Sequence, residues 1–182
     1  MVWDPLPFPK NSDWPGPKGL PPTMAGTALV LQGQDVRTAS LYTAPLTVEC
    51  DVELEARTTS DGSFGIKFIP SGEPADSEPD QIVMFRMIYR NPDAYSGKDG
   101  LVIERRNGSM RGETAWGEEP FDLQAAISYH ITLEILADRL RVSIDKLTYE
   151  AVGVTVPYKK FYVQLSSWQP GDKWLVRSFA VR

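Results

Sequence analysis

Three acidic residues at alternate positions are the side chains of this sequence most able to do chemistry together. Glu49, Asp51 and Glu53 are separated by single residues, and in a β-strand this spacing points all three carboxylates to one face, about 7 Å apart between alternate residues. Retaining glycoside hydrolases use such a pair, one carboxylate as nucleophile and the other as general acid. A glycoside hydrolase with Glu49, Asp51 and Glu53 as catalytic candidates is therefore one hypothesis.

The strand that carries these acids also has a simpler interpretation. Residues 46–57 alternate strictly between polar positions and apolar ones such as Val48 and Val52. An antiparallel strand with one face in water gives the same pattern, and we favour this interpretation over catalysis. Because acids in a row repel one another, we expect basic neighbours, for which Lys67 and Arg86 on nearby predicted strands are candidates.

Other reactive side chains are few. His130 is the single histidine, so any Ser-His triad would require it, and we expect a structural or surface role for it. Cys50 is the single cysteine, which excludes an internal disulfide and a cysteine-based zinc cluster. We predict no metal and no other cofactor, while acidic loop residues leave a structural calcium ion open. These residues are Glu73, Asp76, Glu78, Asp80, Asp93 and Asp99.

Composition narrows the class of protein. The chain has 182 residues, 42% of them hydrophobic, and a net charge of -5. Nucleic-acid binding requires a basic patch, which this sequence lacks, and its apolar runs are too short to cross a bilayer. No secretory signal precedes the prolines. A complete chain is expected in the cytoplasm, and a chain whose signal peptide was removed in the periplasm or outside the cell. Oligomeric state is not indicated.

Two regions are predicted. Residues 1–26 contain seven prolines, which disfavour helix and sheet and predict an extended arm packed on the domain through its aromatic side chains. Residues 27–182 are predicted to form one domain with a period of two, a hairpin turn at Asn107-Gly108 and a weak helical candidate at 121–126. The predicted strands are 27–32, 40–43, 46–57, 63–69, 81–89, 101–106, 109–114, 129–137, 139–144, 151–156, 160–166 and 174–181.

Many short strands without long helices favour an antiparallel sandwich or barrel. Three segments also resemble a known family. Residues 129–135 with 138–145 resemble the aromatic-His strand and following hairpin of concanavalin A-like domains, and 64–68 resemble another strand of that family. Residues 174–181 are similar to the last strand of laminin-G-like and 3-keto-disaccharide hydrolase-type domains. The predicted fold is all-β, a two-sheet antiparallel jelly-roll sandwich of the concanavalin A-like lectin/glucanase superfamily.

The resemblance implies a curved sheet whose concave face receives sugar chains. We therefore expect a carbohydrate partner and glycan binding without catalysis. Sugar rings stack on aromatic side chains beside planar hydrogen-bonding groups. The predicted groove is lined by Glu53, Lys67, Arg86, Tyr162, Gln164 and Trp168. Two alternatives stay open: the glycoside hydrolase, and a protein interaction or assembly module whose proline-rich arm docks on a neighbour.

Overall fold

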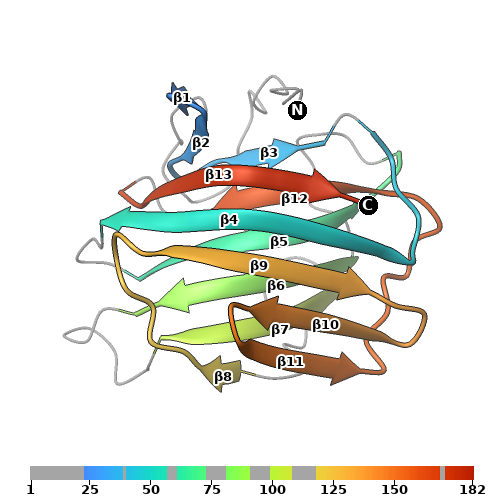
Figure 1. Ribbon diagram of the computed structural model, residues 1–182. Helices are drawn as coiled ribbons and strands as arrows, with labels where there is room; N and C mark the ends of the chain where they lie inside the picture. Colours follow the sequence, from blue (N-terminus) through green and yellow to red (C-terminus); the bar gives the residue numbers. More distant parts are fainter. Residues whose placement is uncertain are drawn as a thin grey trace.

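The computed structural model is a sandwich of two antiparallel β-sheets (Figure 1). The structure describes residues 23–38, 40–56, 61–72, 81–90, 99–107, 118–168 and 171–182. Predictions for residues 1–22, for strand 109–114 and for the acidic residues between 73 and 80 and at Asp93 lie outside these ranges. None of the described residues belongs to a helix long and apolar enough to cross a membrane.

The front layer of Figure 1 is a seven-stranded sheet in the order β1-β2-β13-β4-β9-β10-β11. Its strands are β1 (Thr23–Ala25), β2 (Ala28–Leu31), β13 (Lys173–Val181), β4 (Leu46–Ala56), β9 (Ser128–Ile135), β10 (Arg139–Ile144) and β11 (Leu147–Val152). The strand that carries the three alternating acids, β4, lies inside this sheet between β13 and β9.

The rear layer is a six-stranded sheet in the order β3-β12-β5-β6-β7-β8. Its strands are β3 (Asp35–Arg37), β12 (Phe161–Ser167), β5 (Gly62–Pro70), β6 (Gln81–Tyr89), β7 (Gly100–Asn107) and β8 (Glu118–Pro120). Neighbours in both sheets cross over in the sequence, since β4 pairs with β13 and β3 pairs with β12. Such long-range pairings bring residues far apart in the chain onto one surface.

The core lies between the sheets and follows from period-two alternation. Strand β4 buries every second residue, which are Leu46, Val48, Cys50, Val52 and Leu54. Because successive strand side chains point to opposite faces, the residues between them face outward. The same rule gives the six-stranded sheet an inner face that includes Phe64, Ile66 and Phe68. Trp174 at the start of β13 is fully buried among these rings.

Most predicted strands are confirmed, and the boundaries 81–89 and 139–144 coincide with β6 and β10. The helical candidate at 121–126 is wrong: these residues form a loop and turn, in which the Ala126 N–H donates to the Leu54 carbonyl at 2.7 Å. The strand predicted at 151–156 lies earlier in the chain, as β11 (Leu147–Val152), because the chain reverses at Asp145, whose φ is +51°. A turn at that point starts the next strand at once.

Two further differences concern the N-terminal half. Segment 40–43 makes only an isolated bridge between Tyr42 and Phe161, and the short strand β3 was not predicted. Residues 23–25, which the sequence analysis placed in the arm, form β1 and pair with β2. Short edge strands carry little periodic signal, so they escape a pattern search.

Candidate functional site

Five of the six predicted groove residues share the six-stranded sheet. Lys67 is on β5, Arg86 is on β6, Tyr162 and Gln164 are on β12, and Trp168 follows the end of β12. Gln164 is paired with Lys67, and the residue paired with Arg86, Gly65, is the next outward-facing position of β5. The inward positions of β12, Phe161, Val163 and Leu165, belong to the core. The five side chains therefore extend from the outer face of one sheet.

Glu53 does not belong to this group. It lies on β4, in the seven-stranded sheet, and its side chain faces the opposite surface of the sandwich. There its carboxylate forms an ion pair with Arg177 of β13 at 2.6 Å. The prediction that Glu53 lines the same groove is therefore wrong, because alternation assigns a face of a strand but not the sheet in which the strand lies.

Arg86 is the centre of a polar cluster on the outer face of the six-stranded sheet. Its Nη1 is 3.2 Å and 3.4 Å from the two carboxylate oxygens of Glu104, and its Nη2 donates to the Ser63 hydroxyl at 3.1 Å. The Arg86 guanidinium carbon also lies 5.4 Å from the centre of the Trp168 ring. Side-chain exposures of 15% for Arg86 and 8% for Glu104 place this ion pair where water screens it weakly.

A hollow of about 380 Å³ lies over this cluster. Its walls include Arg86, Glu104, Trp168 and Val102, and Trp168 keeps 46% of its surface exposed. The volume is within the range of small-molecule sites, and the lining combines a few polar groups with apolar surface, as such sites do. Gly65 is paired with Arg86 across β5 and β6, and an added Cβ there would come within 2.8 Å of the Ser166 hydroxyl and 3.4 Å of Arg86 Cγ. A glycine at this position therefore leaves room for both side chains.

Sequence reasoning missed Glu104 and Ser63. Both were inside predicted strands, and the outward parity of Glu104 could have been derived from the core positions Leu101 and Ile103 on β7. Nothing in the sequence pairs β7 with the Arg86 strand, so the ion pair itself was not predictable. The structure supplies that pairing, with Met84 facing Glu104 across β6 and β7.

A second polar group lies farther along β12. Asp35 of β3 accepts from Lys67 Nζ at 3.3 Å and from Gln164 Nε2 at 2.8 Å. The guanidinium of Arg37, on the same short strand, stacks over the Tyr162 ring at 4.3 Å. The unpredicted strand β3 thus adds two charged residues to the face that the sequence analysis proposed.

The three alternating acids lie on the outer face of the other sheet, where each has a partner. Glu49 pairs with Arg182 at 3.0 Å, Glu53 pairs with Arg177, and Asp51 contacts His130 at 2.8 Å. The expectation that Lys67 and Arg86 balance these acids is wrong, because both are on the six-stranded sheet. The balancing groups come instead from β13, from Arg182 directly after it, and from β9.

The surroundings of Asp51 favour its charged form, whereas those of a general acid favour the protonated form. Hydrogen bonds from the Ser178 hydroxyl and from His130 hold the pKa of Asp51 below its ordinary value, whereas a general acid needs a raised pKa. Asp51 also stands between Ser178 and His130, while in a nucleophilic triad the histidine stands between the other two. Burial, with the Asp51 charge adding to it, raises the pKa of the Cys50 thiol, so this thiol stays protonated at neutral pH.

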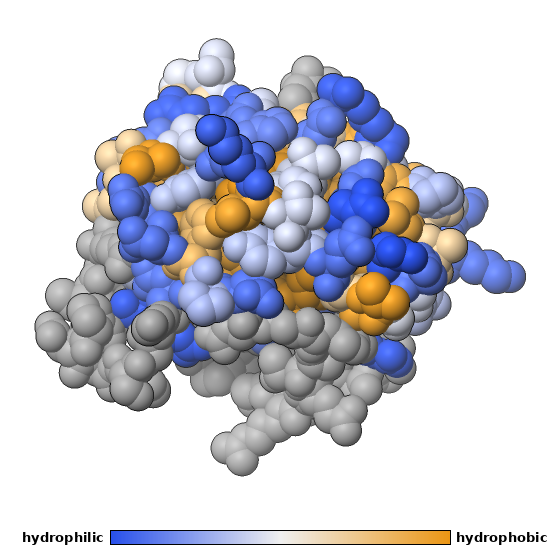
Figure 2. Space-filling model, turned by 60° about the horizontal axis from the view of Figure 1, so that its bottom comes forward, coloured by the Kyte–Doolittle hydropathy of each residue, from blue (hydrophilic) through white to orange (hydrophobic). Residues whose placement is uncertain are grey.

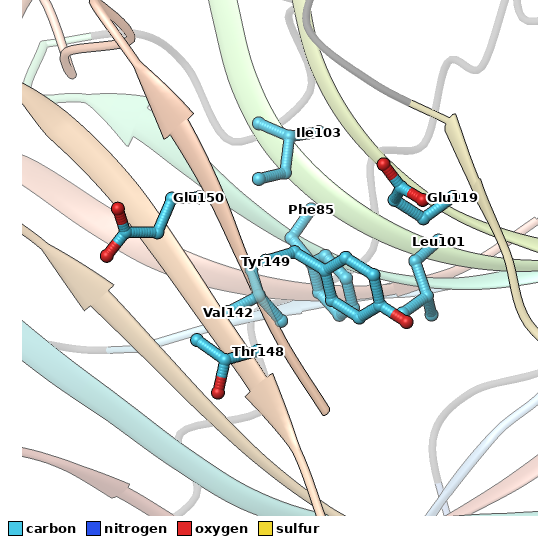
Figure 3. Close-up of a pocket in the computed structure, with 8 residues that line it drawn as sticks. All are labelled: Phe85, Leu101, Ile103, Glu119, Val142, Thr148, Tyr149 and Glu150. Atoms are coloured by element: carbon cyan, nitrogen blue, oxygen red, sulfur yellow. The ribbon is translucent and has the colours of Figure 1, made fainter. Parts of the chain in front are cut away.

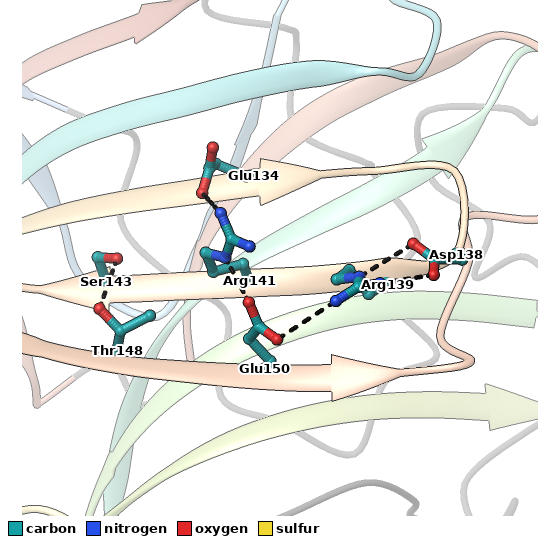
Figure 4. Close-up of polar contacts among 7 residues, drawn as sticks. All are labelled: Glu134, Asp138, Arg139, Arg141, Ser143, Thr148 and Glu150. Atoms are coloured by element: carbon teal, nitrogen blue, oxygen red, sulfur yellow. Dashed lines mark hydrogen bonds and ion pairs between the residues drawn. The ribbon is translucent and has the colours of Figure 1, made fainter.

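The hairpins at the lower side of Figure 1 show the same charge compensation (Figure 4). Arg141 on β10 lies between Glu134 of β9, at 3.2 Å, and Glu150 of β11, at 2.6 Å. Arg139 pairs with Asp138 at 2.8 Å.

Among the described residues no group of three or more acidic, histidine or cysteine side chains gathers as metal ligands. Figure 2, with the bottom of Figure 1 turned forward, shows hydrophilic and hydrophobic residues interspersed among those coloured.

A second hollow, of about 230 Å³, lies between the edges of the two sheets (Figure 3). Core side chains Phe85 and Leu101 form its walls, and Tyr149 from β11 and Glu119 from β8 enter from opposite sheets. Its lining carboxylate Glu150 is already bound to Arg141.

No family model matches the chain, and no curated protein matches it. Solved structures do. The carbohydrate-binding module CBM66 from Bacillus subtilis has a TM-score of 0.63 and 13% identity, covering 91% of this chain and 92% of that one. The fold is an all-β jelly-roll sandwich of two antiparallel sheets. It places the Arg86 hollow and the β12 face on one sheet, and the compensated acids on the other.

Two more structures share this jelly roll. A Bacillus subtilis protein of unknown function with a galectin-like fold has a TM-score of 0.63 at 15% identity, over 85% of this chain and 82% of that chain. The exoplasmic/lumenal domain of VIP36, in a form bound to Ca²⁺ and Man3GlcNAc, has a TM-score of 0.63 at 11% identity, over 88% and 80%. The structural similarity establishes the jelly roll. At identities this low it does not establish the function, which must be argued from the site.

Proposed function

We propose that this protein binds glycans, without catalysis, on the outer face of its six-stranded sheet. The observation that carries the proposal is the exposed Trp168 ring beside the Arg86–Glu104 ion pair, in a hollow of about 380 Å³. Jelly rolls of similar shape include a carbohydrate-binding module and a lumenal domain bound to an oligosaccharide, which supports this class of ligand.

The two kinds of group in the hollow suit the two surfaces of a sugar. The C–H face of a pyranose packs on an aromatic ring, and Trp168 offers 46% of its surface. Sugar hydroxyls both donate and accept hydrogen bonds, so the guanidinium of Arg86 can donate to one hydroxyl while the Glu104 carboxylate accepts from another. Hydrogen bonds that involve a charged group are stronger than neutral ones.

Arg86 and Glu104 are also held in place before a ligand arrives. The contacts of Arg86 with both Glu104 oxygens and with Ser63 fix the plane of its guanidinium. A site that is ordered in advance loses less side-chain entropy on binding. The acids of β4 are held by ion pairs as well, but they line neither of the two hollows described above. Glycan binding at the hollow is therefore favoured over hydrolysis at the β4 acids.

The test is the loss of one ring. We expect Trp168→Ala to weaken binding of a glycan identified on a broad array by at least about tenfold, or roughly 1.4 kcal/mol, because buried tryptophan contacts commonly dominate an interface. Isothermal titration calorimetry measures the Kd. Leu147→Ala is the matched control, since Leu147 is 48% exposed but lies on β11, and Glu53→Gln controls for the opposite face. Both controls should bind as the unmodified protein does.

Two outcomes contradict the proposal. One is an array on which no glycan binds the unmodified protein above background. The other is a Trp168→Ala variant whose Kd equals that of Leu147→Ala.

A further inference from the structure

Arg37 has unused hydrogen-bonding capacity on the ligand face. Its guanidinium stacks on Tyr162, yet its Nε and Nη1 are buried and have no hydrogen-bond partner. The carboxylate nearest in sequence, Asp35, is already bound by Lys67 and Gln164. Among the described residues, no ion pair compensates the Arg37 charge. A buried or partly buried charge without a partner is costly, so an anion beside the exposed part of this guanidinium would stabilise it.

The position of Arg37 relates it to the proposed glycan site. Strand β12 presents Tyr162, Gln164 and Ser166 outward, and Trp168 follows. Tyr162 and Trp168 are six residues apart, or roughly 20 Å along an extended chain. Gln164 is paired with Arg37 on one side and with Lys67 on the other. A linear oligosaccharide that lies along β12 from Trp168 therefore reaches Arg37.

The two ends of this face differ in charge. At the Trp168 end the cation Arg86 is paired with Glu104. At the Tyr162 end the described residues include two cations, Arg37 and Lys67, and one carboxylate, that of Asp35. Among the described residues, the second end therefore carries an excess of positive charge.

We infer that the Arg37–Tyr162 end of β12 takes an anionic sugar unit, one that bears a carboxylate or a sulfate ester, of a glycan anchored at Trp168. This inference rests on the proposed glycan binding and adds the charge of the ligand. The planar guanidinium matches the two oxygens of a carboxylate or sulfate better than an ammonium does, and stacking on Tyr162 holds that plane. The half-exposed Asp35 is neutralised by Lys67, so it does not repel the anion strongly.

The experiment compares matched glycans on the full chain. An array that carries neutral, uronate-containing and sulfated oligosaccharides is probed with the unmodified protein and with Arg37→Gln and Arg37→Lys. We expect anionic glycans to bind more tightly than their neutral counterparts. Arg37→Gln should weaken anionic binding by about tenfold, the loss of one charge-assisted contact, and change neutral binding by less than about twofold, within the error of separate sites. Arg37→Lys keeps the charge but loses the planar guanidinium, so its affinity for anionic glycans should lie between those of the unmodified protein and Arg37→Gln.

Chemical forms of the best ligand separate the two anions. Carboxyl reduction abolishes the preference if a uronate is bound, and desulfation abolishes it if a sulfate is bound. Equal binding of anionic and neutral glycans, or an unchanged preference in Arg37→Gln, overturns the inference while leaving glycan binding intact. The expected contrast is that Trp168→Ala weakens the binding of neutral and anionic glycans alike, whereas Arg37→Gln weakens only that of anionic glycans. If no glycan binds at all, the proposed function fails first and the inference falls with it. Thermal melting checks that each variant is folded.

Discussion

Trp174→Ala is expected to lower the free energy of unfolding by about 3 to 5 kcal/mol, the range for removing a large buried aromatic ring. Trp174 is fully buried where β13 begins. Its ring lies 5.6 Å from that of Phe64 and 6.4 Å from that of Tyr89, both on the six-stranded sheet. Its removal opens a cavity between the two layers, which neighbouring side chains fill only in part.

Urea unfolding at equilibrium measures this change. Val152→Ala is the control, since Val152 on β11 is 65% exposed, and a surface change of this kind should stay within about 0.5 kcal/mol. If Trp174→Ala leaves too little folded protein, Trp174→Phe, which keeps an aromatic ring, should give a smaller but measurable loss. A Trp174 variant as stable as Val152→Ala would contradict the buried position of this ring.

The second large effect is expected at the ion pair of the proposed site. Arg86→Met should lower the free energy of unfolding by about 3 kcal/mol, because it leaves the nearly buried Glu104 carboxylate without its guanidinium partner. The same variant should no longer bind glycan. The double variant Arg86→Met with Glu104→Met should regain much of the stability, since replacing both charges removes the uncompensated one, but it should not regain binding.

This pair of measurements separates stability from recognition. Chemical unfolding of the two single variants and the double variant gives the coupling energy between Arg86 and Glu104. A coupling energy near zero would mean that the contacts of 3.2 Å and 3.4 Å are not formed in solution. A double variant that binds glycan normally would remove Arg86 from the proposed site.

Strand alternation made the fold largely predictable. The pattern of residues 46–57 identified both faces of β4, and the hairpin of β9 and β10 was found with its turn at Asp138. Alternation is local, because it depends only on which side of the strand each residue points to. The pairing of strands is not local. Glu53 was therefore assigned to the wrong sheet, although its outward orientation was predicted correctly.

The candidate site was predictable to the extent that its residues lie on long strands. Arg86 and Gln164 were found because β6 and β12 have clear alternation. Arg37 was missed because β3 has three residues, and Glu104 was missed because its significance depends on the β6–β7 pairing. The helix predicted at 121–126 is wrong for a related reason. The hydrogen bond from the Ala126 N–H to the Leu54 carbonyl joins residues far apart in the chain, and a local pattern does not show it.

Mapping the binding surface tests most directly whether glycans bind on the outer face of the six-stranded sheet. Amide chemical shifts of the isotope-labelled protein, followed by NMR during titration with the glycan that binds most tightly on the array, report which strands contact the ligand. We expect the largest changes at Trp168, including its indole N–H, at Arg86, and along β12 toward Tyr162. Changes concentrated on β4, β9 and β13 around Asp51, or at Tyr149 between the sheet edges, would contradict binding on this face.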